Sequence, residues 1–160
     1  MNKTRLLEQI SLTLEAVHRT ALKATAQAQD TATNKNNVAE NKYDTLGLEA
    51  AYLAHGQAQR VVECEIDLAA YKNLKALDFT DETPVALGAM ILLKDESGSE
   101  QSLFLGPAAG GLKFSFEEKE YLIITPSAPL GRAVLGCFVY DEVELNLGGQ
   151  IKRFEIIAIA

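Results

Sequence analysis

The chain of 160 residues lacks tryptophan and is poor in cysteine, proline and basic side chains. Its two cysteines, Cys64 and Cys137, stand far apart without metal-ligand spacing, which favours free thiols and predicts a reducing compartment. Lysine and arginine number 15 against 22 acidic residues, and the net charge of −7 argues against binding duplex DNA by neutralising its phosphates. A protein partner, or a site that needs carboxylates, fits this charge better.

Long hydrophobic runs are absent as well. No apolar stretch approaches the roughly 20 residues that a membrane-spanning helix needs. The first ten residues contain Arg5, Glu8 and Gln9, which interrupt any apolar core of a signal peptide. The 48% of hydrophobic residues is nevertheless enough to form a core. We therefore expect a soluble protein of the cytoplasm.

Two long helical patterns fill most of the first half. Apolar residues recur at alternating steps of three and four, the spacing of a coiled-coil seam. The first seam contains Leu7, Ile10, Leu14, Val17, Ala21, Ala24 and Ala28. The second contains Leu46, Ala50, Leu53, Val61, Cys64, Leu68 and Tyr71. One slip, between Leu53 and Val61, indicates a stutter. We expect helices from about Thr4 to Thr31 and from the 38–44 region to about Ala76.

Residues 34–43, between the two patterns, read NKNNVAENKY. Three asparagines and a lysine open this segment, and asparagine disfavours helix and suits a turn. Two helices joined by a polar connector can bury their apolar seams only by folding back on each other. The sequence therefore predicts an antiparallel hairpin with this connector as its exposed tip.

After Pro84 the pattern changes to short strands and turns. We expect strands at Val85–Lys94, Gln101–Gly106, Lys119–Thr125, Val143–Leu147 and Ile151–Ile159, with a short helix within Pro126–Gly136. The pair Gly148-Gly149 suits a two-residue hairpin turn. The predicted fold class is α+β: a coiled-coil hairpin over residues 1–77, a linker over 78–84 and a small antiparallel α+β domain over 85–160.

Three segments carry a resemblance to a known family. Residues 128–136 read APLGRAVLG, with Pro129 and Arg132 inside; residues 147–149 read LGG and residues 154–156 read FEI. The connector contains Glu40-Asn41 and Tyr43. These segments are similar to the S-P-[IL]-[AG]-R-[AG]-L-[IL]-G motif, the P-G-G turn with its closing strand, and the tip sequence G-D-L-x-E-N-A-E-Y of the GreA/GreB transcript cleavage factors. The resemblance covers nearly the whole chain.

The resemblance implies a function through another enzyme. In that family the hairpin enters the secondary channel of bacterial RNA polymerase, and its tip carboxylates help hold the second catalytic Mg²⁺ while the polymerase cuts backtracked RNA. Carboxylate oxygens suit this hard cation, and paired metals activate water. An FKBP-like C-terminal domain docks at the channel mouth. The chain is accordingly expected to be a monomer without enzyme activity or a cofactor of its own, which meets nucleic acid only within the transcription complex.

The tip departs from the family pattern at one position. The family places an Asp three residues before the tip Glu; Glu40 matches the Glu, whereas Asn37 stands in place of the Asp. A neutral amide is a poorer Mg²⁺ ligand than a carboxylate. Asp44 or Asp30 is the alternative second acid, and Val38 corresponds to the family's hydrophobic tip residue. We predict that Asn41 and Tyr43 also contribute to binding, whereas Pro129 and Arg132 are mainly structural.

Two other functions remain open. One is a non-cleaving regulator that occupies the secondary channel and competes with active cleavage factors. The other is a peptide-binding or prolyl isomerase module, suggested only by the FKBP-like topology. The second half has no tryptophan and few aromatic residues to line a proline pocket. His18 and His55 lie on separate helices without a nearby nucleophile and acid, so we predict solvated positions for both.

Overall fold

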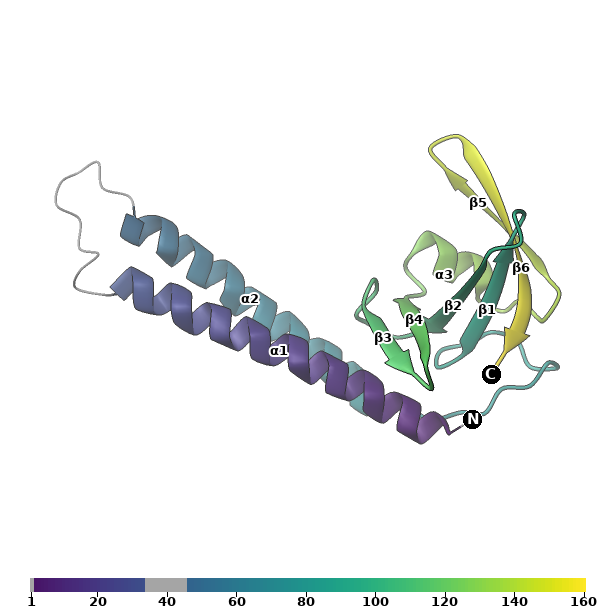
Figure 1. The fold of residues 1–160 in the computed structure, drawn as a ribbon, viewed down its shortest axis with the longest axis horizontal. Coiled ribbons are helices and arrows are strands. Elements are labelled where there is room, and N and C mark those ends of the chain that lie inside the picture. Colours follow the sequence, from purple (N-terminus) through teal and green to yellow (C-terminus); the bar gives the residue numbers. More distant parts are fainter. Residues whose placement is uncertain (1, 34–45) are drawn as a thin grey trace. The chain divides into compact units, whose positions relative to one another are not determined.

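The computed structural model describes residues 2–33 and 46–160 (Figure 1). The chain forms two compact units, one built from Met1–Ser11 together with Ala70–Ala160 and the other from Leu12–Ala69. We call them the α+β unit and the helical unit. The domain boundaries predicted from the sequence stay a prediction. The α+β class and the helical hairpin are confirmed.

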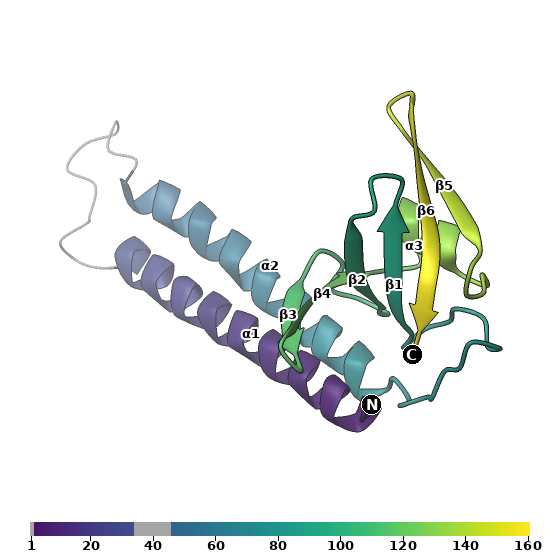
Figure 2. The ribbon, with the colours of Figure 1, turned by 45° about the vertical axis from the view of Figure 1, so that its right-hand side comes forward.

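Two long helices form the hairpin. α1 spans Lys3–Thr33 and α2 spans Leu46–Lys72, and they run side by side in opposite directions (Figures 1 and 2). The predicted end of the second helix near Ala76 is wrong. The helix stops at Lys72. The Leu74 amide donates to the Tyr71 carbonyl at 3.2 Å, and this bond across three residues closes a turn tighter than that of an α-helix.

The buried seam differs from the predicted one on both helices. On α1 it is Leu6, not Leu7, that is fully buried. On α2 Ala54 is buried, whereas Leu53 is 56% exposed. The inner seam of α2 is therefore Ala50, Ala54, Gln57, Val61, Cys64, Leu68 and Tyr71, all buried or half-buried. These positions follow steps of four and three throughout, so the predicted stutter is wrong and α2 is a regular coiled-coil helix.

The α+β unit contains one six-stranded sheet in the order β3-β4-β2-β1-β6-β5. The strands are β1 (Met90–Asp95), β2 (Glu100–Leu105), β3 (Lys113–Phe116), β4 (Lys119–Ile124), β5 (Glu142–Leu147) and β6 (Gln150–Ile159). The helix α3 (Pro129–Val134) follows β4. The expected wholly antiparallel sheet is wrong at one pair, because β2 and β4 are parallel. The unpredicted strand β3 lies between them in the chain and supplies the crossover.

One face of the sheet packs against α3 (Figure 2). Val134 of the helix is fully buried, and Leu130 packs against the same cluster. Most residues of the cluster belong to strands and lie on the inward face of the sheet, as expected where side chains alternate between the two faces. It contains Val85, Ala89, Ile91, Leu93, Leu103, Leu105, Ile124, Val134, Val143, Ile156 and Ile159.

The other face of the sheet carries a row of aromatic rings. Phe104 on β2 contacts Phe114 on β3 edge to face at 6.2 Å, and Phe114 stacks on Tyr121 of β4 at 5.4 Å between centroids. Tyr71, in the last turn of α2, stacks on Phe104 at 6.4 Å. All four rings are buried. Strands β2, β3 and β4 are thus covered on this face as well, and the end of α2 belongs to the core of the α+β unit.

Two polar side chains fix the helix ends to this unit. The Tyr71 hydroxyl donates to the Ala108 carbonyl at 2.9 Å, and it occupies the space where a Cβ on Gly106 would stand, only 2.1 Å away. At the start of α1, the buried Lys3 ammonium donates to the Gly88 carbonyl at 2.8 Å and to the carbonyl of Ala160.

The environment of Lys3 disfavours its charge. Burial lowers the pKa of Lys3 from 10.5 to about 8, and the negative charge of Asp78 opposes this shift. The ammonium also lies 5.0 Å from the centroid of the Phe79 ring, a position in which a cation is attracted to the ring face.

Candidate functional site

The predicted tip lies outside the described residues. This applies to Asn37, Val38, Glu40, Asn41, Tyr43 and Asp44. Asp30, the other candidate acid, is described: it lies near the end of α1 and is exposed to solvent. Pro129 and Arg132 are also described. The described candidates are therefore Asp30 in the helical unit and Pro129 and Arg132 in the α+β unit.

The segment around α3 is held by its backbone. Pro129 is the first residue of the helix, where its missing N–H has no partner to lose. Gly131 is buried, and a Cβ there would lie 1.9 Å from the Thr125 carbonyl oxygen, so only glycine fits. The exposed Arg132 donates through Nη1 to the Ser127 carbonyl at 2.8 Å. These contacts explain the Pro-Leu-Gly-Arg pattern as the means of seating a short helix against the end of β4.

A turn after α3 exposes two aromatic side chains that the sequence analysis missed. Phe138 is 44% exposed and Tyr140 is 73% exposed. The Phe138 amide donates to the Asp141 carboxylate at 2.8 Å, and the Asp141 amide returns a bond to the Phe138 carbonyl at 3.1 Å. Tyr140 has a φ of 69°, and its amide donates to the Ile156 carbonyl at 2.7 Å. We call Phe138–Asp141 the aromatic turn; exposed aromatic residues held rigidly are typical of protein-binding surfaces.

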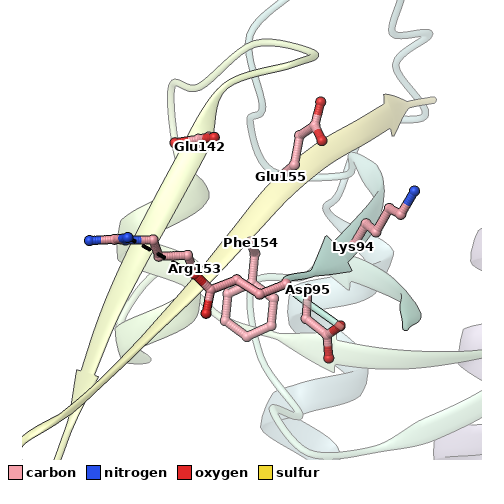
Figure 3. Close-up of a pocket in the computed structure, with 7 residues that line it drawn as sticks. Lys94, Asp95, Glu142, Arg153, Phe154 and Glu155 are labelled. Carbon is pink, nitrogen blue, oxygen red and sulfur yellow. Dashed lines mark ion pairs between the residues drawn. The ribbon is translucent and has the colours of Figure 1, made fainter. Parts of the chain in front are cut away.

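A shallow charged depression of about 260 Å³ lies beside β1, β5 and β6 (Figure 3). Its lining is Lys94, Asp95, Glu96, Glu142, Arg153, Phe154 and Glu155. Arg153 donates through Nε to Glu144 at 2.8 Å, and its Nη1 lies 4.0 Å from Glu96. The Glu144 hydrogen bond and charge raise the pKa of Arg153 further above its usual range.

This depression is better explained by surface charge pairing than by a ligand. Arg153 already has two carboxylate partners, which leaves it poorly placed to bind an anion. The hydroxyl of Ser97 and the amides of Ser99, Ser97 and Gly98 lower the pKa of Asp95, which is engaged in the β1–β2 turn. No group of three metal-ligating side chains occurs among the residues that the structure describes. Phe154 is the one apolar side chain among the seven residues that line the depression.

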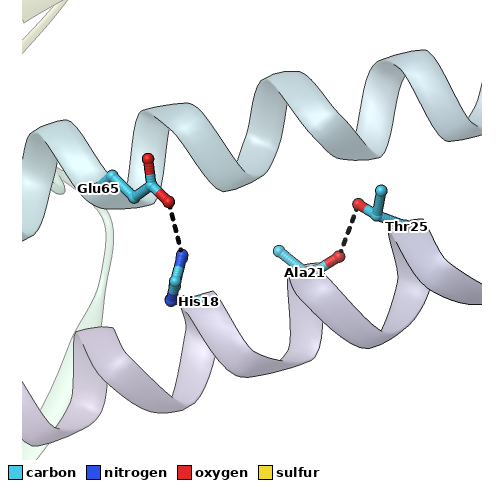
Figure 4. A network of polar contacts seen from close by, with 4 residues as sticks. All are labelled: His18, Ala21, Thr25 and Glu65. Atoms are coloured by element: carbon cyan, nitrogen blue, oxygen red, sulfur yellow. Dashed lines mark hydrogen bonds and ion pairs between the residues drawn. The ribbon is translucent and has the colours of Figure 1, made fainter.

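Two polar contacts of the helical unit are shown in Figure 4. His18 Nε2 on α1 lies 3.2 Å from Glu65 Oε1 on α2, and this pair joins the two helices at one level. Thr25 donates to the Ala21 carbonyl one turn earlier at 2.9 Å. A surface pair of this kind contributes at most about 1 kcal/mol. The prediction that His18 is a solvated residue needs one correction, because it is half-buried beside an acidic partner.

Both cysteines are free, as predicted. Cys64 is buried in the hairpin seam, whereas Cys137 is only half-buried and donates through Sγ to the Ala133 carbonyl at 3.3 Å. Burial, and to a smaller extent the charge of Asp141, raises the pKa of the Cys137 thiol, which makes it a weak nucleophile. In the parts of the chain that the structure describes, no helix is long and apolar enough to span a membrane.

Known proteins with this arrangement act in transcription. The transcription elongation factor GreA of Agrobacterium fabrum is 30% identical over 121 residues, which cover 71% of this chain and 72% of the relative. GreA of Syntrophus aciditrophicus is 26% identical over 123 residues, or 77% of this chain and 71% of the relative. No family model matches the chain. A helical hairpin joined to an α+β unit, with relatives of this kind, defines a transcription elongation factor. The chain belongs to the GreA family of these factors.

Solved structures with a similar course of the chain also come from this group. The transcription factor Gfh1 matches 96% of this chain and 92% of its own length at 24% identity, with a TM-score of 0.41. The Gfh1 of Thermus aquaticus matches 98% and 92% at 23% identity, with a TM-score of 0.38. Scores this low are too weak to assign a function. Membership of the GreA family makes the chain a transcription elongation factor that is not itself an enzyme.

Proposed function

We propose that this protein binds the core of bacterial RNA polymerase and inserts its hairpin into the secondary channel, where it modulates elongation. The observation that carries the proposal is the antiparallel pairing of α1 and α2 in a chain that belongs to the GreA family. With 31 residues, α1 is about 46 Å long, which suits a narrow and deep channel. The protein acts in the cytoplasm and has no cofactor of its own.

The α+β unit supplies the docking surface in this proposal. The aromatic turn offers Phe138 and Tyr140 as exposed anchors, held by three hydrogen bonds from backbone amides, one of which goes to the Asp141 carboxylate. Aromatic anchors in a rigid backbone contribute most of the binding energy of many interfaces. Tyr140→Ala and Phe138→Ala should each weaken polymerase binding about tenfold or more, because each removes an apolar contact without touching the core.

We propose further that the hairpin tip stimulates transcript cleavage only weakly. Glu40 would hold the incoming Mg²⁺ of the polymerase, and Asn37 beside it lacks the negative charge that the family pattern places there. Loss of one charged contact in a desolvated site costs a few kcal/mol, or roughly a hundredfold in rate.

The test is a cleavage assay on backtracked transcription complexes, with polymerase binding measured in parallel. Asn37→Asp should raise the cleavage rate toward a hundredfold, and Glu40→Ala should abolish it. Asn34→Asp is a matched control, because it adds the same charge three residues outside the proposed acid pair. Strong wild-type cleavage that survives Glu40→Ala would refute the assignment of Glu40, and Asp44→Asn and Asp30→Asn would then be tested.

Asn37 also favours a second candidate function. A channel-binding protein whose tip cannot hold Mg²⁺ would act as a competitor of active cleavage factors. In that case no variant would stimulate cleavage, and the wild-type chain would still bind polymerase and displace an active factor. Loss of polymerase binding altogether would refute both candidates.

A further inference from the structure

The outer face of α2 carries a second heptad pattern. The inner seam, which packs against α1, runs through positions 50, 54, 57, 61, 64, 68 and 71. On the opposite side, at the same alternating steps of four and three, lie Leu48, Tyr52, His55, Gln59, Val62, Ile66 and Ala69. All seven are exposed, and their spacing is that of a coiled-coil seam. We call this second row the outer seam.

The outer seam is more apolar than a solvated helix face. Leu48, Tyr52, Val62 and Ile66 are 55%, 71%, 53% and 63% exposed. None of its seven residues is an acid, a lysine or an arginine. A helix that is apolar on opposite sides is usually covered on both.

The equivalent face of α1 is different. Opposite its buried seam, α1 carries Leu12, Ala16, Arg19, Lys23, Ala26 and Asp30, all exposed. Half of these residues are charged, as expected of a helix face in contact with water. The apolar outer face is therefore a property of α2 and not of the hairpin as a whole.

The order of residues along the outer seam is symmetric about position 57. If a second α2 lies antiparallel with its position 57 at the same level, Leu48 meets Ile66 of the second copy and Tyr52 meets Val62. The two polar residues, His55 and Gln59, meet each other in the central layer. Apolar layers thus meet apolar layers, and polar meets polar, as a two-fold interface requires.

We infer that the outer seam is a self-association surface, on which two copies of this protein pair antiparallel through their α2 helices. Its occupant is a second copy because the pattern is complementary to itself. From Leu48 to Ile66 the contact is about 27 Å long. A contact one helix wide lies at the small end of specific interfaces, so we expect a dissociation constant of about 1–100 µM.

At the centre of this interface the backbones of the two α2 helices can approach closely. Gly56 and Ala58 flank the polar layer, and a Cβ built on Gly56 would meet nothing within 4 Å, so the backbone there is open to a neighbouring helix. Within one chain Gln59 Nε2 already lies 3.3 Å from His55 Nε2, which shows that the two side chains can hydrogen-bond. A polar layer in an apolar seam fixes register and orientation.

Charges beside the seam weaken the pairing moderately. In the antiparallel register Glu49 of one copy lies near Glu63 of the other. Arg60 Nη1 lies 3.4 Å from Glu63 Oε2 in the same chain, which offsets part of the repulsion. Since salt screens surface charges and leaves apolar contacts in place, the dimer should become tighter with added salt.

Self-association would prevent the hairpin from entering the channel. A hairpin paired through α2 is wider than a single one, so the dimer would be unable to occupy a channel that admits one hairpin. This differs from the monomer expected from the sequence. The association is nevertheless testable without polymerase, and its failure is therefore separate from failure of the proposed function.

The experiment is sedimentation equilibrium of the full chain over about 1 µM to 1 mM, the range in which such a dimer would form. The 17.4 kDa chain should shift to twice that mass as concentration rises. Tyr52→Glu should raise the dissociation constant about thirtyfold or more, because a carboxylate would be buried without a partner. Val62→Lys should do the same.

The double variant tests the register. Tyr52→Glu with Val62→Lys places opposite charges against each other twice across the two-fold, and should restore association to within about tenfold of wild type. Leu53→Glu is the matched control, because Leu53 is 56% exposed on the same helix but off the outer seam. It should leave association unchanged. Circular dichroism of each variant verifies that the helices are intact.

Three results would overturn the inference. The first is a single 17.4 kDa species at every concentration. The second is a dimer that Tyr52→Glu and Leu53→Glu affect equally, which would place the contact elsewhere. The third is a double variant no tighter than either single one, which would exclude the antiparallel register. A monomer whose seam variants lose polymerase binding would instead assign the outer seam to the polymerase.

Discussion

The buried ammonium of Lys3 should make stability depend on pH in the alkaline range. The side chain reaches the carbonyls of Gly88 and Ala160, and burial lowers its pKa from 10.5 to about 8. Below about pH 8 Lys3 is protonated in the folded chain, and burying its charge lowers the free energy of unfolding. Above about 10.5 the amine is neutral in folded and unfolded chains alike, and the cost is gone. A neutral amine still donates hydrogen bonds to both carbonyls.

The sign and size of the effect follow from this linkage. Between the two pKa values the unfolded chain binds more protons than the folded one, so the free energy of unfolding rises with pH. The difference between the pKa values corresponds to about 3 kcal/mol. Lys3→Met removes the titrating group and keeps a long apolar side chain. The stability of the wild type relative to Lys3→Met should therefore increase by about 3 kcal/mol between pH 8 and 10.5.

The assay is urea denaturation of both chains at half-unit pH intervals from 7 to 11, followed by far-ultraviolet circular dichroism, since tyrosine emission changes at high pH. At pH 7 the wild type and Lys3→Met should have similar free energies of unfolding. Lys3→Met removes the cost of burying the charge but takes a donor from the Gly88 carbonyl, at about 1–3 kcal/mol, whereas the Ala160 oxygen keeps its bond from the Met90 amide. Lys119→Met, which removes an exposed lysine, should follow the wild type. If the free energies of unfolding of the wild type and Lys3→Met changed with pH in parallel, the reasoning would be refuted.

Two further predictions concern the α+β unit. Gly106→Ala should destabilise it by about 2–4 kcal/mol, because the new Cβ would stand 2.1 Å from the Tyr71 hydroxyl. Tyr71→Phe removes that oxygen, so urea denaturation of the double variant should show less than the sum of the two single losses; full additivity would contradict the clash. The β3–β4 turn has Glu117 at φ 47° and Glu118 at φ 64°, both in the left-handed region. Replacing the pair by Asn-Gly should raise the free energy of unfolding by about 1–2 kcal/mol, and an unchanged melting temperature would argue against backbone strain there.

Periodicity was sufficient to predict the two long helices and the β5–β6 hairpin. Alternating steps of three and four mark α1 and α2, and the Gly148-Gly149 pair marks the β5–β6 hairpin, where Leu147 pairs with Gln150 and both glycines have positive φ. These signals are local, so one sequence contains them in full.

The errors came from contacts between distant residues. The seam prediction chose Leu53 over Ala54 because leucine is more hydrophobic, but position 54 is the one that faces α1. Strand β3 has only four residues and comes after a glycine-rich loop, so its pattern is too short to recognise. Missing β3 hid the crossover that makes β2 and β4 parallel.

The candidate site could be predicted only in part. The resemblance supplied the tip residues Asn37 and Glu40, which lie outside the described residues and stay predictions. The structural contacts of Arg132 follow from its place in α3. The aromatic turn could not be predicted, because the exposure of Phe138 and Tyr140 depends on a hydrogen bond from Tyr140 to Ile156, 16 residues later.

The α+β unit is assembled from the two ends of the described chain, and this has a consequence for biosynthesis. Lys3 bonds to Ala160, 157 residues later, so this contact can form only after residue 160 has been synthesised. Residues 12–69 form a unit of their own, so their two helices can pair before the strands are synthesised. Until the sheet has formed, Leu6 and Ile10 in the first turns of α1 remain exposed to water. A fragment of residues 85–160 would lack these side chains and Tyr71, and would expose the aromatic face of its sheet to water.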